Sequence, residues 1–344
     1  MTRIAIEQLL MPSTYFNYMA RAFDDHVRLT AGTPMLPDAI EDYSRPIAVQ
    51  HVLTCIKNAL AMAPAPDWHL SCAKGMAEHF HDPVTMALVS APTLGDGLEA
   101  LVRYMPKRVP YHHWQSVVEH GFHYCELVEL IEFGPVRAIV IEIPILIMHE
   151  YVYTICGGHI DGAHVELRYA PTQYLDSYAR YFECPIVFEA PRNAFVVPES
   201  WLATKNAGYE ESAWQTALRR CEKTSSLSRE QDTLTGVRCE IFNVIETGAG
   251  PASPPNLKSI SETLHVSPRT LIRHLREAGT TYQAVVDDIQ MVRAKELLAN
   301  GNYRVYDVAH ELGFQDPTSF GRSFKRWFGM TPGAYRSALN IEWR

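Results

Sequence analysis

Two segments near the C-terminus begin alike and carry charge at matching positions. They span residues 267–276 and 316–325, and each opens with a Ser or Asp followed by Pro. The Ser or Asp side chain can accept the free backbone N–H groups of a first helical turn, and the fixed φ of Pro suits the first helical position. Both segments are therefore predicted to be helices whose starts are defined by the sequence.

Each predicted helix has one apolar stripe and one polar stripe. At about 100° per residue, Leu271 and Leu275 share one side of the first helix, as Phe320 and Phe324 do in the second. The opposite sides carry Arg269, Arg273 and Arg276 in the first helix and Thr318, Arg322 and Lys325 in the second. Such helices are expected to anchor in a small core and to offer mostly cationic side chains outward.

A further helix and a tight turn precede each segment. Apolar residues recur at helical spacing over 257–264 and again over 308–312. Gly313 suits a left-handed position after the second of these helices, and Phe314 can fold back as an apolar plug. The first unit has His265 at the corresponding turn, which is less typical. Each unit is therefore predicted to be a helix-turn-helix.

The stretch between the two units favours one long helix. Residues 281–299 are mostly helix formers and are followed by Asn300-Gly301, a helix stop. At ~1.5 Å per residue this connector spans roughly 28 Å. Successive major-groove faces on one side of B-DNA lie about 34 Å apart, so a rigid connector of this length could place both units in adjacent grooves.

An ordered set of residues in this region matches a known pattern. The set is Arg293-Ala294, Leu297-Leu298, Val308-Ala309, Gly313-Phe314, Phe320, Arg322, Phe324-Lys325, Gly329, Pro332 and Tyr335-Arg336. Through it, residues 256–338 resemble the DNA-binding domain of the AraC/XylS family of bacterial transcription regulators. By position, the resemblance implies base contacts by Arg269, Ile272, Arg273, Pro317, Thr318 and Arg322.

The outward stripes and the resemblance together give one candidate DNA-binding set. Its members are Arg269, Thr270, Ile272, Arg273, Arg276, Pro317, Thr318, Arg322 and Lys325. Ile272 is apolar and cannot hydrogen-bond to a base edge, although it could touch a thymine methyl. Two alternatives are a merely solvated basic surface and a protein-interaction module. Two cationic helices in the same register favour contact with phosphates and guanine edges instead.

Charge divides the chain in the same way. Residues 253–344 carry 12 Lys and Arg against 9 Asp and Glu, out of totals of 31 and 39, which leaves 19 against 30 for the remainder. Only the C-terminal part is electrostatically suited to DNA. Its excess of positive charge is small, so dimerisation or a contact with RNA polymerase is expected to aid occupancy of the DNA.

The length of 344 residues suggests two domains. Residues 247–255 are rich in Gly and Pro and are predicted to be a linker, after which Asn256 can cap the first helix of the next domain. The expected division is 1–205 as an α+β sensor and dimerisation domain, 206–255 as a helical connector with the linker, and 256–344 as an all-α domain of two helix-turn-helix units joined by a long helix.

Helical and strand-like patterns alternate over the first 246 residues, which favours α+β over other classes. Residues 125–133 and 136–143 flank Gly134-Pro135 and are predicted to form a hairpin. Other strands are expected at 84–90, 165–169 and 186–189, and helices at 46–63, from Thr93 onward, at 145–156 and at 172–182.

A diffuse set of packing residues in this part also forms a pattern. The set is Ala91 to Leu94, Gly97 to Leu101, Tyr104, Tyr181-Phe182, Cys184 to Phe188, Asn193 and Leu202. It resembles the arabinose-binding-type sensor domain of the ornithine-utilisation and VirS-like branch of the AraC family, over about residues 1–205. The resemblance implies a small-molecule sensor but transfers no ligand contact. Aromatic and polar candidates for the pocket are Tyr104, His112, Trp114, Tyr153 and Arg168.

No motif of a hydrolase, P-loop or dinucleotide enzyme is present, so no catalytic residue or cofactor is assigned. The 15 histidines lack the spacing of a known metal site. Some DNA-repair methyl acceptors join an AraC-like module to a reactive cysteine, and Cys184 is the comparable residue here. Its neighbour Glu183 would raise the thiol pKa, so a packed structural cysteine is preferred.

The seven cysteines are scattered without a C-x-x-C pair, which favours reduced thiols in the cytosol. No apolar stretch is expected to span a bilayer, and the N-terminus lacks a signal pattern. The sequence therefore predicts a cytoplasmic, dimeric regulator that binds double-stranded promoter DNA, responds to a small-molecule effector and contacts RNA polymerase as an activator. Repression, an inert dimerisation scaffold and, least favoured, an N-terminal enzyme are the alternatives.

Overall fold

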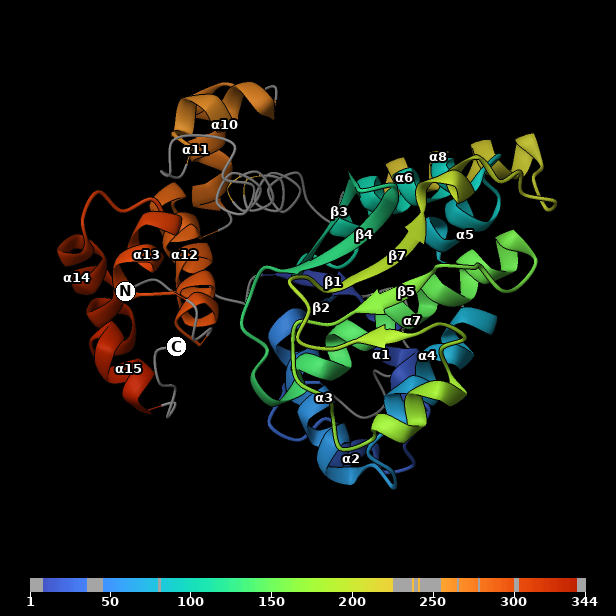
Figure 1. Ribbon diagram of the computed structural model, residues 1–344, viewed down its shortest axis with the longest axis horizontal. Helices are drawn as coiled ribbons and strands as arrows, with labels where there is room; N and C mark the ends of the chain where they lie inside the picture. The colour runs from blue at the N-terminus through green and yellow to red at the C-terminus, as the bar shows by residue number, and fades with distance from the viewer. Residues whose placement is uncertain are drawn as a thin grey trace. The chain divides into compact units, whose positions relative to one another are not determined.

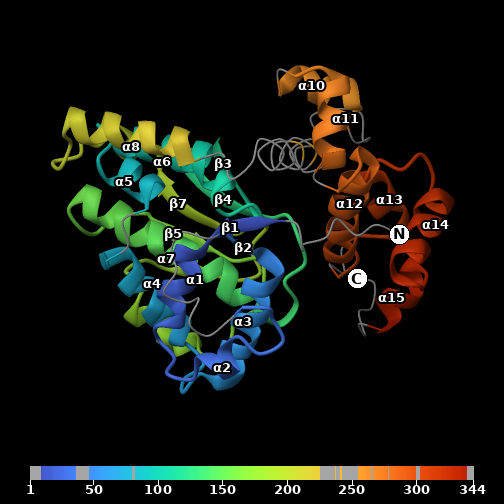
Figure 2. The same ribbon diagram turned by 180° about the vertical axis from the view of Figure 1, so that it is seen from behind.

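The computed structural model describes residues 9–35, 46–79, 82–224, 255–264, 266–277, 279–299 and 303–338, together with Val237 and Ile241. They fall into two compact units, one built mainly from residues up to 227 and the other mainly from the C-terminal helices. Figure 1 shows strands and helices in the first unit and helices in the second, and Figure 2 shows both from behind. The predicted α+β and all-α classes are confirmed.

A five-stranded sheet organises the N-terminal unit (Figure 1). Its strands lie in the order β3 (His112–Glu119), β4 (Phe122–Glu129), β7 (Ala194–Pro198), β5 (His164–Glu166) and β6 (Ile186–Val187). Only β5 and β6 run parallel within this sheet. The predicted strands at 165–169 and 186–189 are confirmed in part, by β5 and β6. A two-residue turn joins β3 to β4, and its His120 and Gly121 have φ values of 52° and 80°, as a type I′ turn requires.

The hairpin predicted around Gly134-Pro135 is wrong. Residues 125–129 do lie in a strand, but that strand pairs with β3 and β7, while Arg137–Cys156 forms the long helix α7. Apolar residues occur all around this helix, and such a segment cannot be told from a buried strand by its period. The pattern is interrupted at Pro144, yet the helix continues through it. The predicted helix at 145–156 is therefore the second half of α7.

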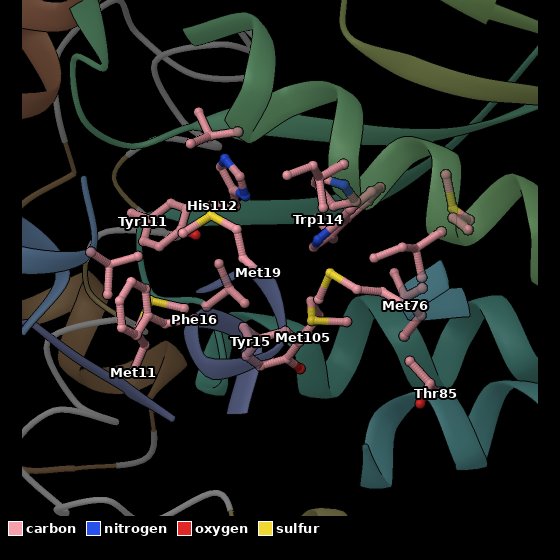
Figure 3. Close-up of a pocket in the computed structure, with 18 of the residues that line it drawn as sticks. Met11, Tyr15, Phe16, Met19, Met76, Thr85, Met105, Tyr111, His112 and Trp114 are labelled. Carbon is pink, nitrogen blue, oxygen red and sulfur yellow. The ribbon is translucent and has the colours of Figure 1, made fainter. Parts of the chain in front are cut away.

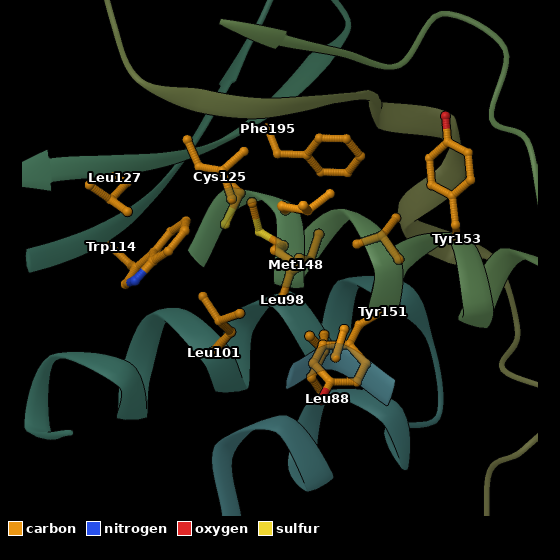
Figure 4. Close-up of a cluster of buried hydrophobic side chains, with 14 of the residues drawn as sticks. Leu88, Leu98, Leu101, Trp114, Cys125, Leu127, Met148, Tyr151, Tyr153 and Phe195 are labelled. Atoms are coloured by element: carbon orange, nitrogen blue, oxygen red, sulfur yellow. The ribbon is translucent and has the colours of Figure 1, made fainter. Parts of the chain in front are cut away.

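Helix α7 is the centre of the N-terminal core. Figure 4 shows it between Phe195 and Cys125 of the sheet on one side and Leu88 and Leu98 of two helices on the other. By length and composition alone the segment Gly134–Cys156 could cross a membrane, contrary to the expectation from the sequence. Because 67% of the most apolar stretch of this segment is buried within the protein, the helix serves as a core element.

The strand predicted at 84–90 is also wrong, because α5 (Pro83–Val89) is a helix. The Asp82 carboxyl accepts the backbone N–H of Val84 at 2.8 Å, and Pro83 occupies the first position. The helix predicted from Thr93 is confirmed as α6 (Leu94–Tyr104), with Thr93 as its cap. A Cβ on Gly97 would lie 2.8 Å from the Leu88 carbonyl oxygen, so glycine allows α6 to pack closely on α5.

The remaining elements of this unit surround the sheet and α7. The helix predicted at 46–63 is confirmed from Val49 onward, and that predicted at 172–182 is reduced to a short 3₁₀ segment. The elements are β1 (Leu10–Pro12), α1 (Ser13–Ala20), α2 (His26–Leu29), β2 (Pro46–Ala48), α3 (Val49–Met62), α4 (Trp68–His79), η3 (Met105–Lys107), η4 (Gly134–Val136), η5 (Leu175–Arg180), η6 (Glu199–Ala203) and α8 (Glu211–Thr224).

One buried carboxyl group joins three parts of this unit. Glu142 of α7 is 1% exposed, and its oxygens accept hydrogen bonds from the hydroxyls of Tyr169 and Tyr178 at 2.7 Å and Tyr174 at 3.1 Å. His69 of α4 places its Nε2 at 2.7 Å from the same carboxyl. Burial and the charge of Glu142 raise the pKa of each tyrosine, so their hydroxyls stay protonated as donors.

The C-terminal unit contains α10 (Leu257–Thr263), α11 (Pro268–Glu277), α12 (Tyr282–Ala299), α13 (Val305–Glu311), α14 (Pro317–Phe328) and α15 (Pro332–Ala338). All the predicted helices are therefore confirmed, including the long connector α12. Asn256 caps α10 as predicted, since its side-chain oxygen accepts the Ser259 N–H at 2.9 Å. His265 and Asn300-Gly301 lie outside the described residues.

Side chains tie the second helix-turn-helix unit to the connector. Gln290 of α12 donates from Nε2 to the Leu312 carbonyl at the end of α13, at 2.8 Å. Arg336 of α15 donates from Nη2 to the Tyr303 carbonyl at 2.6 Å and from Nε to the Leu298 carbonyl at 3.3 Å. The bonds to Leu298 and Leu312 satisfy carbonyls that helix ends leave unpaired, and all three bonds hold α12, α13 and α15 together.

We expect Glu142→Gln to lower the free energy of unfolding of the N-terminal unit by about 2–4 kcal/mol, because an amide nitrogen would face hydroxyl donors in a buried site. Urea unfolding followed by near-UV circular dichroism measures the change. Glu99→Gln on exposed α6 surface is the matched control and should shift stability by less than about 0.5 kcal/mol. Equal effects of the two substitutions would contradict the role given to Glu142.

Candidate DNA-binding surface and ligand pocket

The starts of α11 and α14 have the predicted geometry. Ser267 Oγ accepts the Thr270 N–H at 3.1 Å, and Asp316 Oδ1 accepts the Ser319 N–H at 2.8 Å. The hydrogen bonds from Ser319 lower the pKa of Asp316, which keeps the carboxylate charged beside the first turn. Each helix therefore begins at a position fixed by its cap, and the cap fixes which residues face outward.

On α11 the predicted stripes are clearly separated. Leu271 and Leu275 are buried, whereas the side chains of Arg269, Ile272, Arg273 and Arg276 are exposed. Ile272 is 46% exposed, so its apolar side chain is available for contact. Thr270 is half-buried, and its hydroxyl lies 2.8 Å from Ser267 Oγ. The Arg273 guanidinium approaches Glu277 one turn later at 3.8 Å and remains solvent-accessible.

On α14 the separation is equally clear. Phe320 and Phe324 are fully buried, while Thr318, Arg322 and Lys325 are exposed. Pro317 is half-buried at the first helical position. Arg326, one position further on, instead pairs with Asp287 of α12 at 3.0 Å and so supports the connector. The exposed residues form an outward surface of hydroxyl and cationic groups.

The turns between paired helices are built alike. Gly313 has a φ of 76°, and the Phe314 N–H donates to the Ala309 carbonyl at 2.9 Å. In the first unit the Val266 N–H donates to the Ser261 carbonyl at 2.9 Å, the equivalent bond. The ring of Phe314 packs 5.4 Å from that of Phe320, which confirms the apolar plug expected from the sequence.

This surface is chemically suited to DNA. Guanidinium groups can neutralise phosphates or bind guanine bidentately, and hydroxyls and an exposed apolar side chain can meet base edges and thymine methyls. The predicted DNA-binding residues thus lie on exposed faces of α11 and α14, with Thr270 and Pro317 half-buried at the helix starts.

A pocket of about 930 Å³, its open mouth included, lies within the N-terminal unit. Its walls come from β1, α1, α3, α4, α5, α6, η3, β3 and α7, and Figure 3 shows how the side chains converge. Most of the lining is aliphatic, aromatic or methionine, and no Lys, Arg, Asp or Glu is among the described residues that form it. The sequence did not predict five methionines of this lining: Met11, Met19, Met76, Met105 and Met148.

Two of the residues proposed from the sequence as ligand contacts line this pocket. His112 and Trp114 stand two positions apart on β3, so both side chains project to the same face (Figure 3). Each is 1% exposed, and neither the His112 ring nitrogens nor Trp114 Nε1 has a hydrogen-bond partner among the described residues. Burial lowers the pKa of His112 to about 3, so its ring is uncharged at neutral pH.

The other three predicted ligand contacts lie elsewhere. Tyr104 is buried in the core, where Arg103 lies 5.3 Å from its ring centre. Tyr153 packs 4.2 Å from the ring of His149 on α7, on the sheet side of the helix (Figure 4). The Arg168 backbone N–H donates to the Asn193 side chain at 3.0 Å. None of the three lines the pocket.

Polar groups at one wall of the pocket form a cluster that the sequence analysis missed. Arg108 and Asp82 form a buried ion pair, and the Arg108 guanidinium lies 6.0 Å from the ring centre of Tyr15, which lines the pocket. The Thr85 hydroxyl, also in the lining, donates to the Asp82 carbonyl at 2.9 Å. Tyr15 lies 67 or more positions before the other three residues in the chain, and no periodic pattern joins them.

The described residues contain no group of three His, Cys, Asp or Glu side chains placed to hold a metal ion. The six cysteines among them are free thiols. Burial raises the pKa of Cys184 to about 12, with a smaller effect of Glu183 in the same direction. A thiol with so high a pKa is a poor nucleophile, so the packed structural role predicted for Cys184 fits its surroundings.

Comparison with known proteins gives matches to both units. A model described as the arabinose-binding domain of AraC transcription regulator matches residues 25–206, and a helix-turn-helix domain model matches residues 260–338. The ornithine utilization regulator of Pseudomonas aeruginosa is 26% identical over 82% of this chain and 81% of that protein. The urease operon transcriptional activator of Escherichia coli is 33% identical over 25% of this chain and 29% of that protein. The crystal structure of the transcriptional regulator CdpR from Pseudomonas aeruginosa is 19% identical, with a TM-score of 0.42 and coverage of 93% and 98%.

The buried neutral His112 should make stability depend on pH. Its contribution is fully present above the unfolded-state pKa of 6.5 and is lost as the pH falls toward about 3, because protonation favours the unfolded chain. Between about pH 7 and about pH 4.5 the wild type should lose about 2 kcal/mol more unfolding free energy than His112→Leu. Urea titrations at each pH measure this. The exposed His159→Leu is the control and should keep the wild-type profile, and identical profiles for all three proteins would contradict the assignment.

Proposed function

The chain belongs to the AraC family of DNA-binding transcription regulators, and on that premise we propose that it activates transcription from promoter DNA in response to a small-molecule effector. The observation that carries the DNA-binding part is the pair of capped helices, α11 and α14, each with a buried apolar stripe and an exposed cationic one. The proposed DNA-binding residues are those expected from the sequence: Arg269, Thr270, Ile272, Arg273 and Arg276 on α11, and Pro317, Thr318, Arg322 and Lys325 on α14.

The proposed mode of action includes a homodimer and a contact with RNA polymerase. The small excess of positive charge over residues 253–344 gives weak long-range attraction to DNA, so a second DNA-binding domain would raise occupancy. The urease operon relative is named as a transcriptional activator, which supports activation over repression. Because promoter DNA is the target, we propose a cytoplasmic location.

The division of labour follows the predicted domains. Residues 1–205 are proposed as the sensor and dimerisation domain, 206–255 as the connector and 256–344 as the DNA-binding domain. Helix α8 lies within the proposed connector and packs on α5, and its Ala217 and Cys221 are buried in the N-terminal core. This contact gives the proposed connector a physical link to the sensor core.

A ligand-independent scaffold is the second candidate for the N-terminal unit. The pocket favours the sensor. Its His112 and Trp114 side chains have buried hydrogen-bonding groups without partners among the described residues, and a bound ligand could pair them. A domain that only dimerises would bear the cost of these unpaired groups without any gain. Relatives named as regulators support a non-enzymatic role for the chain.

We expect Arg273→Ala and Arg322→Ala each to weaken specific DNA binding by about 1–3 kcal/mol and to relax base preference at one operator position. Each removes a guanidinium from an exposed stripe without touching the buried one. Gel-shift titration against a selected operator and its single-base variants measures both effects. Arg28→Ala, an exposed arginine of the N-terminal unit, is the control. Wild-type affinity and base preference in both variants would refute the assignment.

A fragment from about Pro254 to Arg344 should fold alone and bind the same operator more weakly than the full chain. Its helices bury their own core, including Leu271, Phe320 and Phe324, and the full chain adds the proposed dimer contacts. Near-UV circular dichroism and gel shifts test this. Phe324→Ala in the fragment should abolish its near-UV signal, since Phe324 packs on Phe320, Phe328 and Tyr335. A molten wild-type fragment, or one that binds as tightly as the full chain, would contradict the prediction.

A further inference from the structure

The pocket contains two buried hydrogen-bonding side chains without partners among the described residues. Trp114 offers one indole N–H, and the uncharged imidazole of His112 offers one donor and one acceptor. Leaving such groups unpaired in an apolar site costs free energy, and buried polar atoms in native proteins are nearly always paired. Both line the pocket from the same strand, so a single oxygen of a bound molecule could serve both (Figure 3).

Two other polar side chains of the lining lie beside a buried ion pair. Tyr15 and Thr85 line the wall beside the buried Arg108–Asp82 pair, and the Thr85 hydroxyl is bonded to the Asp82 carbonyl. Arg108 itself is not part of the lining, and its charge is matched by Asp82. The pocket therefore presents unpaired hydrogen-bonding groups at His112 and Trp114 and an apolar surface over most of the rest.

We propose, on the basis of the proposed sensor function, that this pocket binds an uncharged, largely hydrocarbon molecule whose one hydroxyl or carbonyl oxygen is held by Trp114 and His112. A hydroxyl group accepts the Trp114 N–H and can donate to an imidazole nitrogen, while a carbonyl accepts from both. The hydrocarbon part packs against methionines and aromatic rings such as Met105 and Phe16. Methionine adapts to irregular ligand shapes and makes favourable contacts with rings.

The same observations argue against polar effectors. A pentose carries several hydroxyls, and each one left without a partner in an apolar pocket costs about 1–3 kcal/mol. A free amino acid or a carboxylate brings full charge to a site whose described lining has no Lys, Arg, Asp or Glu. The family model's description and the name of the ornithine-related protein therefore do not indicate the effector of this chain.

Three bicyclic probes of similar shape test the proposal with the full-length chain. Isothermal titration near neutral pH compares naphthalene, 2-naphthol and 2-naphthoate, which carry no polar group, an uncharged hydroxyl and a carboxylate. We expect 2-naphthol to bind about fivefold to tenfold more tightly than naphthalene, as one net hydrogen bond provides. 2-Naphthoate should bind most weakly. Binding of 2-naphthoate as tight as that of 2-naphthol, or no preference for 2-naphthol over naphthalene, would overturn the proposal.

Substitutions show whether the preference arises at the assigned side chains. Trp114→Phe removes the indole N–H but keeps a ring, and His112→Leu removes both ring nitrogens. Each should reduce the preference for 2-naphthol over naphthalene to less than about twofold. Trp68→Phe is the matched control, because Trp68 also has a buried unpaired Nε1 but does not line the pocket. Retention of the full preference in both pocket variants would overturn the assignment. If one variant does not fold, the other and the wild-type order of the probes still decide.

Gel shifts with saturating 2-naphthol separate this proposal from the sensor function. A change in operator affinity supports both, since coupling requires different ligand affinities in two states of the protein. The predicted order of probes with unchanged operator affinity would uphold the pocket chemistry and overturn sensing through this pocket. The wrong order of probes with normal operator binding would overturn the pocket chemistry alone.

Discussion

The buried carboxyl of Glu142 is the constraint on which the N-terminal unit depends. It lies on α7, whose apolar residues occur on every side, so hydrophobic burial alone does not select one rotation of the helix about its axis. Three tyrosine hydroxyls and His69 bond to this one group, so only one rotation of α7 satisfies them. The same rotation turns Ile143, Ile147 and Tyr151 into the pocket. A polar contact thereby fixes the shape of an apolar site.

The sequence predicted the C-terminal unit well because its signals are local. Caps at Ser267 and Asp316, the glycine turn at Gly313 and the 3.6-residue period each act over a few residues. Asp82 and Pro83 start α5 with the same kind of cap, but the short apolar run that follows is equally typical of a buried strand. The strand predicted at 136–143 is wrong for a similar reason. A helix with apolar residues on every side shows no 3.6-residue alternation of apolar and polar residues in its sequence. The β3–β4 turn at His120-Gly121 lacks the Asn or Asp that usually marks such a turn, so the sequence does not predict the hairpin that β3 and β4 form.

The pocket could be predicted only in part, because its walls come from segments far apart in the chain. His112 and Trp114 were identified by residue type, and their alternation on one strand brings them together. Tyr104, Tyr153 and Arg168 are also aromatic or polar, but none of them lines the pocket. The methionine lining has no sequence signal, since its members lie on β1, α1, α4, η3 and α7 and meet only after folding.

The bonds from Gln290 and Arg336 make α12 part of the same rigid piece as the second helix-turn-helix unit. In a helix, each added residue advances the chain by about 1.5 Å and turns it by about 100°. Distance and orientation between α11 and α14, the proposed DNA-binding helices, are thus coupled through a single number, the length of α12. A change of one residue would barely alter the spacing but would point one helix away from the groove. Spacing between the two DNA segments that these helices are proposed to recognise can therefore change only in steps of about one helical turn.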